Sequence, residues 1–168
     1  MRHVKNIILL LVIAAGFASC TDETIAPAKE KQMVTISTRG DSTGKGFSFS
    51  QGKFVNFSSG VKPDILGASR TNDKGEILGP IFLSTNTEDS FHLKQEFNTI
   101  ESAQVFFNSL QTHNGGEFQS ITNTLQPGQV WVIRTNDGKL AKVLIHQIVN
   151  ADTDGLYKNI TLEWGILK

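Results

Sequence analysis

The chain has 168 residues, 39% of them hydrophobic, and carries 16 basic and 16 acidic side chains. That length and composition fit one packed globular domain, and no second domain is needed. No basic stripe stands out along the sequence, which excludes nucleic acid as the expected partner.

The first segment has the pattern of an export signal. Arg2, His3 and Lys5 form a charged start, residues 7–17 form an apolar run, and residues 18–20 are small. The run is shorter than the ~20 residues of a membrane-spanning helix. We therefore expect a cleaved signal peptide at residues 1–19, the alternative being a buried core helix. Its removal leaves 14 basic against 16 acidic residues.

Cys20 is the single cysteine of the chain. An exported chain with one cysteine has no disulfide partner for it. Residues 17–20, FASC, resemble the lipobox of bacterial lipoproteins, in which the cysteine thiol carries a diacylglycerol after cleavage. The resemblance implies that Cys20 is lipidated and anchors the chain to a membrane without spanning it.

Residues 20–32 lack apolar periodicity and are interpreted as a flexible, lipidated tether. Asp22 and Glu23 follow the anchor closely. In Bacteroidota lipoproteins, an acidic cluster at this place resembles the signal for export to the outer leaflet, and the alternative is a solvated linker. The expected location is the outer membrane, either surface-exposed or facing the periplasm.

The remaining residues, 33–168, are predicted to form a single β-rich domain. Short strands are expected at residues 33–38, 47–50, 53–57, 64–68 and 76–85, where apolar and polar residues alternate or β-formers gather between turn residues. Gln51 and Gly52 separate the second and third strands as a hairpin turn. Pro80 lacks a backbone donor, so its strand should lie at a sheet edge or contain a bulge.

One helix is predicted to begin near Asn98. Asn98 and Glu101 match a capping box. Apolar residues then recur at spacings of three and four, which gives a single stripe suited to covering a sheet. The stripe consists of Ile100, Ala103, Phe106, Phe107 and Leu110.

Residues 129–149 predict the central hairpin of the fold. Two runs rich in Val, Ile and Trp flank Asn136, Asp137 and Gly138, a strong turn signal between β-formers. Residues 157–167 are expected to lie beside the hairpin as a third strand. The prediction is a mainly β fold, an antiparallel sandwich or meander of eight or nine strands with one covering helix.

Three histidines remain after signal removal. His146 lies in step with apolar residues of the hairpin and is interpreted as a strand side chain. His92 and His113 flank the predicted helix beside loop residues, where ligands are often bound. Both are candidate ligand-binding residues, with exposed loop histidines as the alternative.

No catalytic motif is visible in the chain. It has no GxSxG elbow, no HExxH zinc motif and no phosphate-binding glycine loop. The acid pairs Glu88-Asp89 and Asp152-Asp154 are interpreted as turn residues. Trp131 and Trp164 are interpreted as core residues. We expect no enzyme activity and no metal site.

The C-terminal half resembles a known family. Residues 130–143, VWVIRTNDGKLAKV, and 160–164, ITLEW, are similar to the closing hairpin of the HmuY-like lipoproteins of Bacteroidota. Upstream, residues 47–53 and 63–65 are similar to early segments of that family. The resemblance implies an all-β haem-binding protein, lipid-anchored at the outer membrane or shed from it. His92 and His113 are proposed from their sequence positions and not from the resemblance.

Together these observations predict a cell-envelope lipoprotein that binds a small hydrophobic ligand, with haem as the leading candidate and an outer-membrane receptor as a further expected partner. The alternative is a structural or protein-interaction β module of the outer membrane that binds no small ligand.

Overall fold

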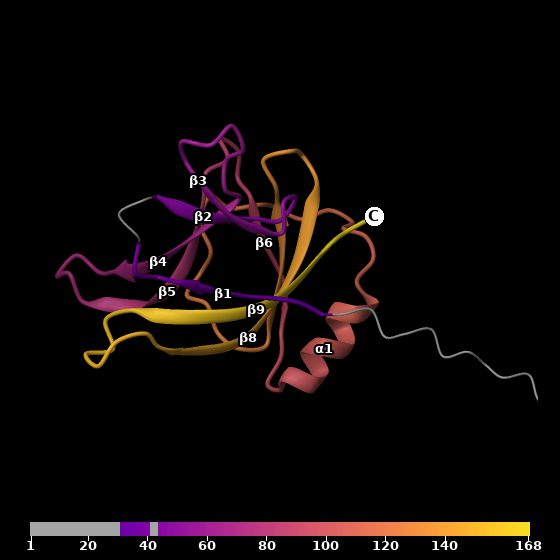
Figure 1. Ribbon diagram of the computed structural model, residues 1–168. Helices are drawn as coiled ribbons and strands as arrows, with labels where there is room; N and C mark the ends of the chain where they lie inside the picture. The colour runs from indigo at the N-terminus through magenta and orange to yellow at the C-terminus, as the bar shows by residue number, and fades with distance from the viewer. Residues whose placement is uncertain (1–30, 41–43) are drawn as a thin grey trace, which may run out of the picture. The chain divides into compact units, whose positions relative to one another are not determined.

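The computed structural model describes residues 31–40 and 44–168 (Figure 1). The signal segment, Cys20 and the tether up to residue 30 lie outside the described residues. Within the described ranges, residues 31–168 form one compact unit. Its elements are β1 (Gln32–Ser37), β2 (Lys45–Ser48), β3 (Lys53–Asn56), β4 (Ile65–Thr71), β5 (Ile77–Ser84), β6 (Phe91–Glu96), α1 (Ile100–Ser109), β7 (Gln129–Arg134), β8 (Leu140–Asn150) and β9 (Lys158–Ile166).

The mainly β prediction is confirmed, because the strands form two antiparallel sheets accompanied by one short helix. The five-stranded sheet has the order β1-β9-β8-β7-β6, and the four-stranded sheet has the order β3-β2-β4-β5. In the larger sheet β7, β8 and β9 are a meander, so the last strand lies beside the hairpin as expected. β1 adds to the outer side of β9, with Gln32 opposite Trp164.

The β7–β8 hairpin turns where the sequence predicts it. The backbone N–H of Thr135 donates to the Lys139 carbonyl, and that of Gly138 donates to the Thr135 carbonyl. Gly138 has a φ of 80°, a conformation that glycine adopts without strain. The orange hairpin rises beside β6 in Figure 1.

One strand was not predicted. β6 pairs with β7, Phe91 opposite Ile133, although residues 86–90 were expected to be polar connecting chain and no strand was predicted directly after them. Phe91, His92, Leu93 and Lys94 alternate apolar with polar, which is the pattern of a half-buried strand. The placement of His92 in a loop is therefore wrong, because it lies within β6.

The two sheets share one core. Buried side chains from both sheets pack together, among them Phe47, Ile65 and Phe82 from the smaller sheet and Phe91, Trp131 and Leu162 from the larger. Trp131 is fully buried and Trp164 packs against the core, as their strand positions predict. β5, which contains Pro80, is an edge strand of the smaller sheet.

α1 packs on the other face of the five-stranded sheet. Its buried residues Ala103 and Phe107 contact Val130 of β7 and Leu144 of β8. The N-cap is Thr99 and not Asn98: the Thr99 hydroxyl accepts a hydrogen bond from the Ser102 backbone N–H at 3.2 Å. The predicted helix is correct, and its start differs by one residue because the threonine hydroxyl takes the capping role.

Candidate functional site

His92 lies on the face of the larger sheet that α1 partly covers. Its neighbours in sequence, Phe91 and Leu93, point into the shared core. Successive strand residues point to opposite faces, so His92 projects outward. Its partner on β7 is Val132, and Val130, on the same face, is buried beneath α1.

His113 lies in the loop that follows α1, and this loop crosses back over β6. The ring centres of His92 and His113 are 5.0 Å apart, with the ring planes at 62°. The structure therefore brings together the two histidines proposed from the sequence, one from a strand and the other from a loop.

Two adjacent glycines allow the loop to make this approach. Gly115 has a φ of 70° and Gly116 a φ of 119°. A Cβ atom at Gly116 would lie 2.3 Å from Cε1 of His92. A side chain at this position would push the imidazole away, so glycine is required both for the backbone conformation and for the contact.

The hydrogen bonding of His92 fixes its tautomer. Nδ1 of His92 lies 2.8 Å from the backbone carbonyl oxygen of Glu117. A carbonyl can only accept a hydrogen bond, so Nδ1 carries the proton and donates. The lone pair of the neutral ring is then on Nε2, which is the arrangement found where histidine binds a metal.

His113 has nitrogens without partners. Both Nδ1 and Nε2 are shielded from solvent and make no hydrogen bond with the described part of the chain. Burial, followed by the charges of Lys94, His92 and Arg134, lowers the pKa of His113 below its ordinary value. The ring is therefore held neutral, with an available lone pair. Buried polar atoms are seldom left unpaired in native proteins, so these nitrogens mark a candidate ligand position.

An aromatic side chain and a guanidinium complete the cluster. The Phe118 ring lies 5.2 Å from His113 and 5.8 Å from His92, measured between ring centres. The Arg134 guanidinium carbon lies 4.5 Å from the centre of the Phe118 ring. Arg134 is on β7, two residues beyond the partner of His92. We call His92, His113, Phe118 and Arg134 the histidine cluster.

The cluster offers two protein nitrogens as ligands. In the described ranges no group of three or more His, Cys, Asp or Glu side chains is placed to hold a metal ion. The cluster therefore presents a pair of imidazoles in contact with each other.

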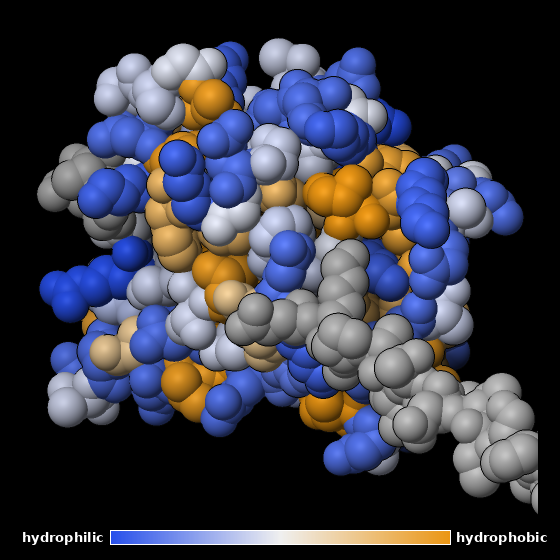
Figure 2. Space-filling view, turned by 45° about the vertical axis from the view of Figure 1, so that its right-hand side comes forward, coloured by the Kyte–Doolittle hydropathy of each residue, from blue (hydrophilic) through white to orange (hydrophobic). Residues whose placement is uncertain are grey.

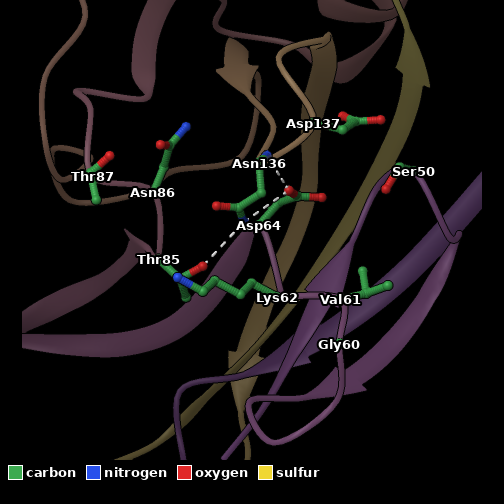
Figure 3. Close-up of a pocket in the computed structure, with 10 residues that line it drawn as sticks. All are labelled: Ser50, Gly60, Val61, Lys62, Asp64, Thr85, Asn86, Thr87, Asn136 and Asp137. Carbon is green, nitrogen blue, oxygen red and sulfur yellow. Dashed lines mark hydrogen bonds between the residues drawn. The ribbon is translucent and has the colours of Figure 1, made fainter.

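A hollow of about 480 Å³ lies near the β7–β8 turn (Figure 3). Its lining residues are mostly polar and include Lys62, Asn86 and Asn136. Asp64, buried at its floor, accepts hydrogen bonds from the backbone N–H of Phe49 at 2.7 Å and of Asn136 at 2.6 Å. These bonds join the two sheets, so Asp64 has a structural role.

The remaining candidate positions have ordinary environments or are not described. Cys20, the predicted lipidation site, lies outside the described residues. His146 approaches Glu163, with Nε2 and Oε2 3.2 Å apart, and takes no part in the cluster. No helix in the described part of the chain is long and apolar enough to cross a membrane.

Phe118 and Arg134 were missed from the sequence as site residues. Phe118 lies in a segment with no regular pattern, and only the fold shows that it contacts both imidazoles. Arg134 belongs to the hairpin string that carries the family resemblance, but that string does not show which face of the strand it occupies.

Fold and cluster together define a protein of two antiparallel β-sheets with a pair of adjacent histidines on the outer face of the larger sheet. No family model, no curated protein and no solved structure matches the chain.

Proposed function

We propose that this protein is a cell-envelope lipoprotein that captures haem through His92 and His113. The observation that carries the proposal is the contact between the two imidazoles, with Nε2 of His92 and one nitrogen of His113 available as ligands. The HmuY-like pattern of the hairpin agrees with the same ligand. The proposed role is binding and not catalysis.

The proposal requires an opening of the cluster. The two imidazole rings are in contact, with centres 5.0 Å apart, and Gly116 packs against the His92 ring. A planar macrocycle enters only if the loop that contains His113 and Gly116 moves away from β6. The glycines of that loop allow such a movement.

Titration with haemin tests the proposal. Wild-type protein should shift the Soret band of haemin and give the low-spin spectrum of an iron with two imidazoles. His92→Ala and His113→Ala should each abolish that spectrum. His146→Ala is the matched control, since it removes a histidine outside the cluster, and should bind as wild type does. A free-haemin spectrum with the wild-type protein would rule the proposal out.

The envelope location is proposed from the FASC motif and Cys20. Expression of the full chain with a radiolabelled fatty acid should label the wild-type protein. The Cys20→Ala variant should be unlabelled and absent from the membrane fraction. Labelling that persists in Cys20→Ala would contradict anchoring at this residue.

A protein-interaction module is the second candidate function. Phe54 of β3 and Phe57 just beyond it are 45% and 46% exposed, and β3 is an edge strand. Exposed apolar residues beside an unpaired edge are suited to pairing with another chain. Figure 2 shows hydrophobic residues in separate patches on one face. This candidate would be favoured if haemin fails to bind and Phe54→Ser lowers self-association measured by sedimentation.

A further inference from the structure

The two imidazoles of the histidine cluster have the spacing that one tetrahedral metal ion requires. Their ring centres are 5.0 Å apart. With Zn–N bonds of ~2 Å and ring nitrogens about 1.1 Å from the ring centre, two imidazoles at the tetrahedral angle have centres about 5 Å apart, against about 6 Å on opposite sides of the ion. Aromatic rings in ordinary contact reach the same distance. The spacing therefore permits a shared ion, and the evidence for one comes from the ring nitrogens.

His92 is held as metal-binding histidines are held. Its Nδ1 donates to the backbone carbonyl oxygen of Glu117 at 2.8 Å. In metal sites a ligating imidazole nearly always donates its other N–H to a carbonyl or a carboxylate, which fixes the ring and makes the remaining nitrogen more basic. That remaining nitrogen, Nε2, has no hydrogen-bond partner among residues 31–40 and 44–168.

His113 supplies the second nitrogen. Both of its ring nitrogens are shielded from solvent and have no hydrogen-bond partner in the described part of the chain. A neutral imidazole has one N–H and one lone pair, and burying either without a partner destabilises the fold. A metal ion bound to the lone pair would remove half of that cost.

We propose that His92 and His113 together bind one Zn²⁺ ion in the closed arrangement of the cluster, with water molecules at the other two tetrahedral positions. This inference goes beyond haem capture and does not depend on it. The sequence has no zinc motif, because one ligand comes from a strand and the other from a distant loop. In the described ranges no third His, Cys, Asp or Glu side chain joins the pair.

A bare ion fits the closed cluster where a planar ligand does not. A Cβ atom at Gly116 would lie 2.3 Å from Cε1 of His92, so the loop packs closely on this ring. A macrocycle around the metal would collide with the loop. A bare ion approaches each imidazole in the plane of the ring, along the lone pair, so turns of the rings about their Cβ–Cγ bonds direct both lone pairs at it while the loop stays in place.

Nearby charges limit the affinity. Lys94 and Arg134 act on His113 as positive charges, and they oppose a cation. Glu88 offsets Arg134, since its Oε2 lies 2.7 Å from Nη1. With two protein ligands and this opposing charge, we expect a dissociation constant in the micromolar range. Imidazole also suits copper and nickel, but the ring spacing matches the tetrahedral angle that zinc prefers.

Calorimetric titration with zinc chloride tests the proposal. The full chain is used without an affinity tag and with Cys20→Ala, so that neither a tag nor the thiol competes for the ion. This protein should bind one Zn²⁺ per chain. Adding His92→Ala or His113→Ala should weaken binding at least about tenfold. His146→Ala is the matched control and should bind zinc as the parent protein does, and circular dichroism verifies that each variant is folded.

Cobalt in place of zinc reports the geometry, because tetrahedral Co²⁺ absorbs visible light much more strongly than octahedral Co²⁺. The intense spectrum should appear with the parent protein and be lost in both cluster variants. Absence of zinc binding, an octahedral cobalt spectrum, or equal zinc affinities in the parent and both cluster variants would overturn the inference. Haemin titration is a separate measurement. Zinc binding without the haem spectrum would remove the proposed function alone, and the haem spectrum without zinc binding would remove this inference alone.

Discussion

Asp64 is a buried carboxylate whose hydrogen bonds join distant segments of the chain. It receives the backbone N–H of Phe49 from the smaller sheet and that of Asn136 from the β7–β8 turn. The sequence shows an aspartate after a proline, but it does not show that the carboxylate is 1% exposed. That role depends on two turns meeting at the end of the sandwich.

Asp64→Asn should lower the free energy of unfolding by about 2 kcal/mol, because an amide cannot satisfy donors on both of its faces. Urea unfolding followed by tryptophan fluorescence measures the change. Asp73→Asn, in an exposed turn, should have the same urea midpoint as wild type. An equal midpoint for Asp64→Asn and wild type would show that the two bonds contribute nothing.

Asp137 makes the stability of the hairpin depend on pH. The Thr135 hydroxyl and then the Lys139 side chain, through hydrogen bonds, lower the pKa of its carboxyl below the ordinary value. The unfolded chain therefore binds the proton first as pH falls. The stabilisation is complete above the ordinary carboxyl pKa and is lost as pH falls through the folded one.

Asp137→Asn should accordingly unfold at lower urea than wild type at neutral pH, and the difference between the two should shrink as the pH falls through the carboxylate range. Unfolding curves at several pH values measure it. A difference that is constant with pH would mean that the charge of Asp137 is not the cause.

The loop that follows α1 and crosses over β6 determines the geometry of the histidine cluster. Sequence patterns predicted the central hairpin, its third strand and the helix, since each carries a local signal. The sequence patterns did not predict β6. Residues 91–94 alternate apolar with polar side chains, but the polar residues before and after them are typical of a loop. The meeting of His92 with His113 depends on how the Gly115-Gly116 loop folds back, and no periodicity encodes that.

Gly116→Ala should displace His92 and weaken haemin binding, because the new Cβ would collide with the imidazole. Gly115→Ala is the control: it also has a positive φ, 70° against 119° at Gly116, and no atom lies within 4 Å of its Cβ. Both variants should lose at least about 1 kcal/mol of stability from backbone strain, and only Gly116→Ala should lose affinity for haemin. Equal haemin affinities for the two variants would contradict a role for the contact between Gly116 and His92 in haemin binding.

Over the whole molecule, the proposed ligand capture would be thermodynamically linked to fold stability. Two sheets share one core, and the candidate site lies on the outer face of the larger sheet, between β6 and the loop after α1. A ligand that binds only the folded protein stabilises all of it. That coupling gives a test independent of the haem spectrum.

Haemin at a hundred times its dissociation constant should raise the free energy of unfolding by about 2.7 kcal/mol. The doubly substituted His92→Ala, His113→Ala protein should show no such increase. Thermal unfolding followed by circular dichroism measures the effect. A similar rise in the double variant would place haemin elsewhere on the protein.

β1 is one of the two edge strands of the larger sheet, and β9 is its hydrogen-bonded neighbour. Its pairing runs from Gln32 opposite Trp164 to Ser37 opposite Asn159. A pulling force applied through the N-terminal side of the chain would therefore load this antiparallel ladder before it reaches the core. The mechanical strength of the protein under tension is set there, some distance along the chain from the histidines that would hold a cargo.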